Sequence, residues 1–364
     1  MTSELKKVSL VLVTGASGYV ASHIVRLLLQ KGYKVRGTVR SLTDEQKVKP
    51  LNDLYQNSRF PLQLVEVNLL NKDGWDDALK SCEFVIHVAS PFPSKPPSQE
   101  EEVLKPAVDG TLLVLKACAR AGSVRRVVLT SSVAAVHGET TVKEEQVYGP
   151  QNWTDEDSPF TDAYAKSKTL AEKTAWDFVR GLPEEQRFEL VSINPGIVLG
   201  PMLTNVVGTS VFPIRKMMSM TMPLVPAVNF YLCDVRDVAL AHWKAITVPE
   251  AAGKRFIIGS ASIWFKEMSL ILFEEFVKQG YWVFRRHCPY WLVWLTSFID
   301  SSALLILPRI ENVYKYDNSL MINLLKITPR NFKQTIIDTA YSLIERGLLP
   351  KRKWYTGPKE RDSW

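Results

Sequence analysis

The chain has 364 residues, of which 46% are hydrophobic and 23% are charged, and its formal net charge at neutral pH is +7. These proportions are ordinary for a globular protein and argue against a disordered chain, a collagen-like repeat and a membrane protein with many spans. A chain of this length forms one large domain or two of medium size. We expect no nucleic-acid partner, because the basic residues do not gather in a block interleaved with aromatic residues.

The cysteines and the N-terminus indicate the cellular compartment in which the protein is expected. Cys82, Cys118, Cys233 and Cys288 are widely spaced without a CxxC pair, which predicts neither a disulfide framework nor a metal site. The polar N-terminus leads directly into a short apolar run rather than into the longer apolar stretch of a secretory signal. We therefore expect a cytoplasmic protein, with the cytoplasmic face of a membrane as the alternative.

The first half of the chain alternates between apolar runs of strand length and segments of helix length. This rhythm is typical of parallel strands that crossover helices cover on both faces. We therefore predict an α/β fold with a Rossmann-type, doubly wound parallel sheet over residues 8–195. The expected strands are 8–14, 33–39, 62–67, 84–89, 126–130 and 189–194, and the expected helices are 21–30, 108–121 and 162–180.

After Pro195 the rhythm changes, and prolines separate shorter elements. We predict a smaller, mostly helical lobe over residues 196–350 that binds the substrate, followed by a polar tail over 351–364. Residues 228–248, which include an expected strand, should return to the first domain. Helical periodicity reappears at 235–246, 265–278 and 332–346.

The segment from Tyr290 to Leu307 is apolar and close to the length that spans a membrane. Asp300 near its middle would cost a few kcal/mol at the centre of a bilayer. We therefore expect a buried helix pair in the second lobe. An interfacial membrane anchor is the alternative, because Tyr290, Trp291 and Trp294 would suit a headgroup boundary.

A glycine turn follows the first expected strand and opens the first expected helix, with the sequence TGASGYVA from Thr14 to Ala21. Glycine allows the sharp turn and a close approach to a pyrophosphate, and the helix N-terminus offers free N–H groups. The spacing is GxxGxxA rather than GxGxxG. The turn predicts a dinucleotide site, with a purely structural turn as the alternative. Its candidate binding residues are Gly15, Ser17, Gly18, Tyr19 and Val20.

The second expected strand bears on the choice of nicotinamide cofactor. It contains Arg36 and ends at Arg40, with Lys47 shortly after and no carboxylate between Tyr33 and Leu42. A carboxylate at this point would bind a ribose hydroxyl, whereas a guanidinium binds a phosphate. We therefore expect NADP(H), with a solvated strand end as the alternative.

A serine pair and a YxxxK motif form the candidate catalytic set. Ser131 and Ser132 end the strand at 126–130, at the sheet edge where open α/β sheets bind ligands. Tyr164 and Lys168 lie one helical turn apart on one face. A serine hydroxyl can polarise a carbonyl oxygen, and an ammonium beside a phenol favours the phenolate.

Seven motifs run from about Val11 to His242. As a set they resemble the extended short-chain dehydrogenase/reductases, in the branch of dihydroflavonol, cinnamoyl-CoA and methylglyoxal or aldehyde reductases. The resemblance implies that Ser132 is the catalytic serine and Tyr164 the proton donor. It also implies that Lys168 binds the nicotinamide ribose and lowers the pKa of the tyrosine. The motifs are VTGASGYVASHIV, VRGTVR, FVIHVASP, VVLTSS, YAKSKTLAEKTAW, INPGIVLGP and DVRDVALAH.

The resemblance also implies further contacts. Arg40 and Lys47 correspond to residues that grip the 2′-phosphate. Pro91 and His137 are the candidate substrate contacts, although His137 could equally be a loop histidine. The remaining implied cofactor contacts are Asn68, Leu69, Val88, Ala89, Ser90, Pro195, Val198 and Ser210.

Four departures from the family pattern stand out. Ala21 replaces the third glycine, and Asn68 replaces an aspartate that usually contacts adenine. His137 stands where plant dihydroflavonol reductases have an asparagine, and the NWYCY-like signature of cinnamoyl-CoA reductases is missing around Tyr164. The resemblance therefore favours neither of those two substrates.

These observations favour NADPH-dependent reduction of a small or medium, largely apolar aldehyde or ketone by a monomer or homodimer without a metal. Phe212, Phe230 and Tyr231 would form the apolar wall of the pocket. A membrane-associated enzyme similar to 3β-hydroxysteroid dehydrogenases is one alternative. A protein that binds NADP(H) as a sensor without turnover is the other.

Overall fold

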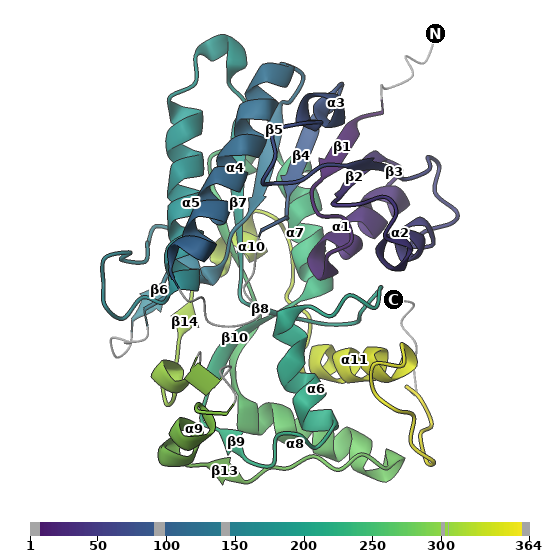
Figure 1. Ribbon diagram of the computed structural model, residues 1–364, viewed down its shortest axis with the longest axis vertical. Helices are drawn as coiled ribbons and strands as arrows, with labels where there is room; N and C mark the ends of the chain where they lie inside the picture. Colours follow the sequence, from purple (N-terminus) through teal and green to yellow (C-terminus); the bar gives the residue numbers. More distant parts are fainter. Residues whose placement is uncertain (1–7, 91–98, 140–145, 300–302, 305, 359–364) are drawn as a thin grey trace.

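The central sheet has seven parallel strands within the residues that the computed structural model describes, which are 8–90, 99–139, 146–299, 303–304 and 306–358. It forms the upper part of the molecule in Figure 1. The strand order is β11-β7-β5-β4-β1-β2-β3, and each neighbouring pair is parallel. The predicted doubly wound sheet is therefore confirmed. The strands are β1 (Leu10–Val13), β2 (Lys34–Val39), β3 (Gln63–Glu66), β4 (Phe84–His87), β5 (Arg126–Thr130), β7 (Glu189–Pro195) and β11 (Arg255–Ile258).

Helices cover both faces of this sheet. Two shorter helices fill the connections on either side of β3. The layer on one face consists of α1 (Tyr19–Gln30) and α7 (Val235–Thr247), and the layer on the other of α4 (Glu101–Ala121) and α5 (Ala163–Arg180), while the shorter helices are α2 (Glu45–Asn52) and α3 (Trp75–Leu79).

Alternation along the strands explains the two layers. Val11 and Val13 of β1 pack in the cluster that contains α1 and α7, whereas Leu12 packs in the cluster that contains α4 and α5. Successive side chains of a strand point to opposite faces, so a strand covered on both faces must be apolar throughout. This is why the strands are continuous apolar runs in the sequence.

The order of the strands reverses at β1, whose neighbours are β2 on one side and β4 on the other. Open α/β sheets bind ligands at the carboxyl edge beside such a reversal. The segments that follow β1, β2, β4 and β5 therefore meet at one edge of the sheet.

The second lobe lies below this edge in Figure 1. Its core is a three-stranded sheet against which α8 (Phe265–Phe276) and α11 (Phe332–Glu345) pack, while α6 (Phe212–Met218) packs on these two helices. The strands are β8 (Ile197–Leu199), β10 (Asn229–Asp234) and β12 (Ala261–Trp264). Shorter elements complete the lobe and its connections: β6 (Val147–Tyr148), β9 (Val225–Pro226), β13 (His287–Cys288), β14 (Lys315–Tyr316), α9 (Tyr290–Thr296) and α10 (Ser319–Asn323).

The chain crosses between the two lobes more often than the sequence analysis expects. Of residues 228–248, only α7 packs on the large sheet, because β10 pairs with β8 and β12 in the small one. The strand β11, which falls inside the range predicted for the second lobe, adds to the edge of the large sheet beside β7. The helix α7 acts as a further crossover, so the strand after it reaches the large sheet again.

The segment that begins at Tyr290 is not a buried helix pair, and that expectation is wrong. Among the described residues of this segment the one α-helix is the short α9, and of its side chains only Val293 is buried. Most of the other large apolar side chains between Tyr290 and Leu304 are exposed. The reason is that α9 packs against the lobe on one side, through a small cluster around Val293 and Cys288. Within the described residues, no helix is both long and apolar enough to cross a membrane.

Candidate active site

Ser132 follows β5 at the carboxyl edge of the sheet. Its hydroxyl accepts a hydrogen bond from the N–H of Ala134 at 3.1 Å, which starts a single turn of 3-10 helix. The Ser132 side chain also lies close to that of Tyr164 and lowers the pKa of the phenol. The carbonyl of Ser132 accepts from Nδ2 of Asn194 at 3.1 Å, so the neighbouring strand β7 fixes its backbone.

Tyr164 lies in the first turn of α5. The helix begins there because the Asp162 carboxylate accepts a hydrogen bond from the N–H of Ala165 at 2.8 Å. Lys168 is buried one turn further along, with its Nζ 6.0 Å from the centre of the Tyr164 ring. The structure therefore brings Ser132, Tyr164 and Lys168 together at one point of the sheet edge.

Burial dominates the protonation of this set. It raises the pKa of Tyr164 to about 12, although the hydrogen bond with Ser132 acts in the opposite direction. Burial also lowers the pKa of Lys168 to about 8, against the attraction of Glu172. Desolvation of the phenolate is the largest effect on this pKa, and the lowering of the tyrosine pKa by Lys168 stays a prediction. At neutral pH Tyr164 therefore holds its proton.

Glu172 is a site residue that the sequence analysis missed. It lies one turn after Lys168 on α5 and is fully buried. Its carboxylate accepts hydrogen bonds from Ser131 at 2.6 Å and from Nδ2 of Asn194 at 2.8 Å. Burial alone would raise the pKa of Glu172, but the ion pair with Arg255 and these hydrogen bonds lower it below its usual range.

Arg255 on β11 is the counter-charge of Glu172, and its Nε lies 2.7 Å from the carboxylate. The rest of the guanidinium donates to the carbonyls of Pro150, Asn152 and Ala135, and it lies 3.6 Å from the centre of the Trp153 ring. These bonds tie the loop before α5 to the edge strand. From the sequence, only the position of Glu172 could have been suspected. Tyr164, Lys168 and Glu172 are each four residues apart, which places three polar side chains on one face of the helix.

The glycine turn has the geometry that a pyrophosphate requires. Gly15 has a positive φ of 64°, and a Cβ atom there would lie only 3.0 Å from the Cβ of Ala89. Its N–H donates to the hydroxyl of Thr38 at 2.9 Å, and the N–H of Gly18 donates to the carbonyl of Gly15 at 2.8 Å. Gly18 is the N-cap of α1 and brings no capping side chain. The first turn of α1 is therefore open to an anion.

The other residues predicted in the turn differ in what their side chains can do. Ser17 and Val20 are half-buried. Tyr19 is buried, and its hydroxyl donates to the carbonyl of Gly200 at 2.8 Å, so its side chain ties α1 to the second lobe. Only its backbone remains to face a phosphate.

The end of β4 is held against the turn by a threonine. The Thr14 hydroxyl accepts from the N–H groups of Val88 and Ala89, both at 3.0 Å, and bonds to Nδ1 of the buried His87 at 2.8 Å. Val88, Ala89 and Ser90 are half-buried and line the same edge as Gly15. The sequence analysis does not name Thr14 or His87. Their hydrogen bonds hold the end of β4 against the glycine turn.

At the end of β2, Arg40 is exposed, whereas Nζ of Lys47 forms an ion pair with Asp44 at 2.6 Å. The neighbouring Arg36 does not reach this edge, because its guanidinium donates to the carbonyls of Asp77, Ala78 and Lys80. Of the basic residues in this strand region, Arg40 is thus the one best placed for a phosphate.

Asn68 and Leu69 follow β3. The side-chain oxygen of the exposed Asn68 accepts from the N–H of Leu70 at 3.0 Å, while its Nδ2 is a donor that an adenine ring could use. Leu69 lies beside Gly110 of α4, where a Cβ atom would be 3.5 Å from the leucine Cβ. Leu69 therefore packs against the helix that covers this part of the sheet.

Pro195, Val198 and Ser210 lie at the junction with the second lobe. Pro195 ends β7, and Val198 is a buried residue of β8. The Ser210 hydroxyl donates to the carbonyl of Val198 at 2.6 Å, which closes the loop between β8 and α6. The three residues therefore lie at or after the end of β7, which is the neighbour of β5, the strand that Ser132 follows.

His137 has a packing role in this structure. Its ring is buried and stacks on the ring of Tyr148 with centres 3.8 Å apart, and Tyr316 donates to its carbonyl at 3.1 Å. This arrangement favours the loop-histidine alternative over a substrate contact. Pro91, the other candidate substrate contact, lies outside the described residues.

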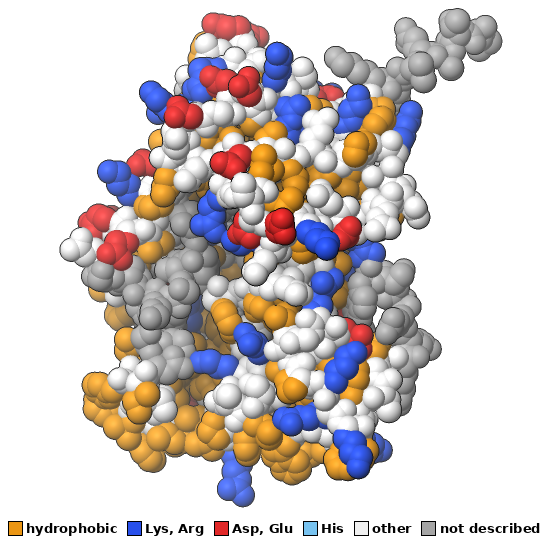
Figure 2. Space-filling view, turned by 45° about the vertical axis from the view of Figure 1, so that its right-hand side comes forward, with side chains coloured by type: hydrophobic (Ala, Val, Ile, Leu, Met, Phe, Trp, Pro, Cys, Tyr) orange, Lys and Arg blue, Asp and Glu red, His pale blue; other side chains and the backbone are white. Residues whose placement is uncertain are grey.

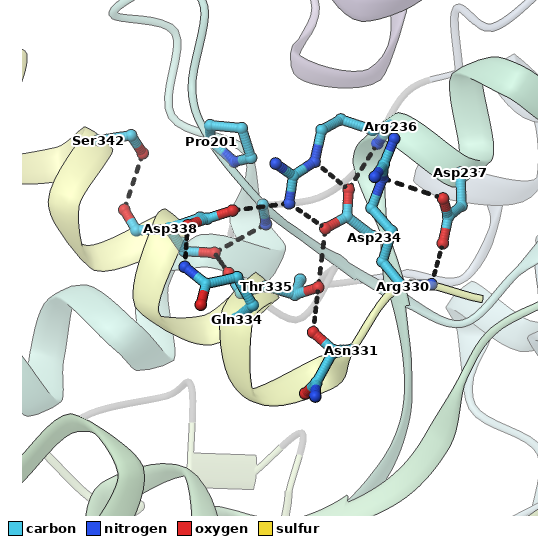
Figure 3. A network of polar contacts seen from close by, with 12 residues as sticks. Pro201, Asp234, Arg236, Asp237, Arg330, Asn331, Gln334, Thr335, Asp338 and Ser342 are labelled. Carbon is cyan, nitrogen blue, oxygen red and sulfur yellow. Dashed lines mark hydrogen bonds and ion pairs between the residues drawn. The ribbon is translucent and has the colours of Figure 1, made fainter. Parts of the chain in front are cut away.

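A polar network joins the second lobe to the same edge (Figure 3). Asp234 at the end of β10 caps α7 and accepts from Thr335 of α11 at 2.7 Å. Arg236 bridges Asp234 and Asp338, with both ion pairs at 2.7 Å. A second link joins Arg309 to Asp162, the N-cap of the helix that carries Tyr164, at 2.6 Å. Sequence spacing does not reveal either link.

Comparison with known proteins agrees with this geometry. A cinnamoyl-CoA reductase of Petunia hybrida is 35% identical over 344 residues, which are 93% of this chain and 93% of that protein. The crystal structure of the yeast methylglyoxal/isovaleraldehyde reductase Gre2 complexed with NADPH has a TM-score of 0.75 and 30% identity, and the match covers 93% of this chain and 100% of that one. The model of the NAD dependent epimerase/dehydratase family matches residues 11–259. The chain belongs to this family.

Membership confirms the resemblance to the extended short-chain dehydrogenase/reductases that the motifs indicate. An anthocyanidin reductase of Vitis vinifera is a further relative, 36% identical over 280 residues, which are 72% of this chain and 80% of that protein. The relatives named here are reductases, so the chain is an oxidoreductase by family.

We predict that Glu172→Gln lowers the free energy of unfolding by about 3 kcal/mol, because the buried guanidinium of Arg255 loses its counter-charge while the shape of the side chain is kept. Urea denaturation measures this change. The matched control is Glu156→Gln, which removes a more exposed pair with Lys173 and should cost less than about 1 kcal/mol. Equal losses in the two variants would contradict the assignment of Glu172 as the anchor of α5.

Proposed function

We propose that the protein is an NADPH-dependent reductase that converts an aldehyde or ketone to an alcohol. The observation that carries this proposal is the closeness of the Ser132 side chain to Tyr164, with the buried Lys168 one helical turn from Tyr164. These three groups lie at the carboxyl edge of the sheet, the edge at which the glycine turn follows β1. A polarising hydroxyl, a proton-bearing phenol and a cation beside a dinucleotide turn are what carbonyl reduction requires.

The residues at the edge fit a phosphorylated dinucleotide. The tight space at Gly15 and the open first turn of α1 would hold the pyrophosphate. The exposed guanidinium of Arg40 would bind the 2′-phosphate, and this favours NADPH over NADH. The structure of the related yeast reductase was determined in complex with NADPH.

Each residue of the set has a defined part in the proposed reduction. When bound, NADPH supplies the hydride to the carbonyl carbon. The Ser132 hydroxyl orients the carbonyl oxygen, and Tyr164 donates the proton that the new alkoxide takes up. The raised pKa of Tyr164 keeps that proton in place before the reaction. The ammonium of Lys168 would bind the ribose of the cofactor and stabilise the phenolate that remains.

The substrate is proposed only as a class, a small or medium apolar carbonyl compound. Two of the three aromatic residues expected to form its wall pack inside the second lobe. The ring centres of Tyr231 and Tyr316 are 5.0 Å apart, and those of Phe230 and Phe265 are 5.4 Å apart. Phe212 is exposed and remains a candidate for the wall. We also propose that the domain of the large sheet binds the cofactor and that the second lobe binds the substrate.

We predict that Tyr164→Phe lowers kcat by about 10²- to 10⁴-fold, because the proton donor is lost while the ring still fills its place. NADPH binding, measured by fluorescence, should stay close to that of the parent. The control is Tyr33→Phe, at the amino end of β2 and thus at the opposite edge of the sheet. Parental turnover by Tyr164→Phe would exclude the proposed mechanism.

The second prediction concerns the cofactor. Arg40→Ala should weaken NADPH binding about 10- to 100-fold and leave NADH binding unchanged, because a charged hydrogen bond to phosphate is worth roughly 1.5–3 kcal/mol. Calorimetric titration with both cofactors measures this. Lys34→Ala at the other end of the strand is the control. If Arg40→Ala weakened the binding of both cofactors equally, the guanidinium would not be the reader of the 2′-phosphate.

The third prediction concerns pH. Because the pKa of Lys168 is lowered to about 8, its ammonium is present below that pH and is lost above it. NADPH binding should therefore weaken as the pH rises through about 8. Lys168→Met should bind weakly at all pH values and lack this dependence. A parental affinity that stays constant up to pH values near 10.4, where an ordinary lysine titrates, would contradict the role given to the ammonium.

A further inference from the structure

Seven large apolar side chains gather on the outer end of the second lobe, and we call this group the aromatic face. Of the 17 large hydrophobic side chains that are exposed among the described residues, these seven fall within residues 290–304. Such a concentration is not the scattered exposure that is normal for a protein surface. The members are Tyr290, Trp291, Trp294, Leu295, Phe298, Ile299 and Leu304.

The aromatic face is presented outward by a small core of its own. Val293 packs with Cys288 and Ala303, and this cluster holds α9 on the lobe. The side chains beyond it project into solvent, since Phe298 is 71% exposed and Ile299 is 93% exposed. Figure 2 shows hydrophobic side chains gathered along the lower end of the molecule, where Figure 1 places α9 and β13. The face is therefore convex rather than a groove.

Cations outnumber carboxylates in the sequence around the aromatic face. Residues 276–304 contain Lys278, Arg285 and Arg286 and one carboxylate, Asp300. Arg286 is exposed, two residues before the Cys288 that packs under α9. The guanidinium of Arg285 lies 3.5 Å from the centre of the Phe273 ring on α8.

We propose that the aromatic face docks on the surface of a lipid bilayer with anionic headgroups. Tyrosine and tryptophan are enriched at the boundary between headgroups and acyl chains, because their rings are apolar and carry one polar atom. Leu295, Phe298 and Ile299 would enter the acyl region, while Arg285 and Arg286 would bind the headgroups. The protein would lie on the membrane without crossing it.

The charges favour a membrane over a second copy of the chain. A symmetric contact between two copies would bring their arginines toward each other, and residues 276–304 contain only Asp300 as a carboxylate against Lys278, Arg285 and Arg286. Anionic headgroups would neutralise the same arginines. A convex face also suits a deformable lipid surface, whereas protein interfaces bury their anchor residues in matching pockets.

Sedimentation of the full chain with vesicles tests this proposal. The protein should pellet with vesicles of phosphatidylcholine and phosphatidylserine, less with phosphatidylcholine alone, and less at high salt. Trp291→Ser combined with Trp294→Ser should lower the bound fraction about tenfold or more, because the variant loses much of the apolar area that enters the lipid. Arg286→Gln should weaken binding only to the anionic vesicles.

The control is Trp354→Ser, because Trp354 is 65% exposed but lies outside the aromatic face. Its binding to vesicles should equal that of the parent, and circular dichroism should show the same fold for all variants. Three results would overturn the proposal. The first is a parent chain that stays in the supernatant with anionic vesicles, and the second is a double variant that pellets as the parent does. The third is light scattering that shows a lipid-free dimer of the parent and a monomer of the double variant, which would assign the face to contacts between copies.

Discussion

One buried carboxylate determines how the candidate active site is assembled. Glu172 of α5 contacts the residue after β5 through Ser131, β7 through Asn194 and β11 through Arg255. The helix that carries Tyr164 and Lys168 is thereby fixed to adjacent strands of the sheet. Burying an ion pair costs desolvation energy, and here the hydrogen bonds to the same carboxylate offset that cost. The pair therefore contributes to a unique position of the helix more than to stability alone.

This anchor also explains why two neighbouring serines have different partners. Ser131 donates to Glu172, so its hydroxyl is used to hold the helix. Ser132 lies close to Tyr164 and is, in the proposed mechanism, the serine that contacts the substrate. The second lobe is joined to the same region by Arg236 with Asp338 and by Arg309 with Asp162. The site thus depends on ion pairs between segments that are far apart in the sequence.

The sequence predicts the sheet well because a strand buried on both faces is a local signal. The expected strand at 126–130 coincides with β5, and the expected helix at 162–180 differs from α5 only at its start. That Ser132, Tyr164 and Lys168 come together could also be predicted, since the helical spacing is local and the strand end fixes the edge, whereas their catalytic roles stay predictions. The glycine turn was predicted for the same reason.

What the sequence could not predict depends on contacts across the fold. The partners of Glu172 lie on separate strands, and only the fold shows that β11 returns to the sheet. The raised pKa of Tyr164 follows from burial, which the helix spacing does not contain. The exposure of Trp291 and Trp294 was mispredicted because hydropathy does not show whether an apolar segment finds a partner to pack against.

The central claim is that Ser132, Tyr164 and Lys168 form one reducing site beside a bound nicotinamide ring. The most direct test uses NADPH labelled with deuterium at C4 of that ring, a panel of aldehydes and ketones, and mass spectrometry of the products. We predict that deuterium appears on the carbinol carbon of an alcohol product with the parent chain and that Ser132→Ala forms far less of it. A chain that binds NADPH but transfers no deuterium to any carbonyl compound, or an equal transfer by Ser132→Ala, would contradict the account.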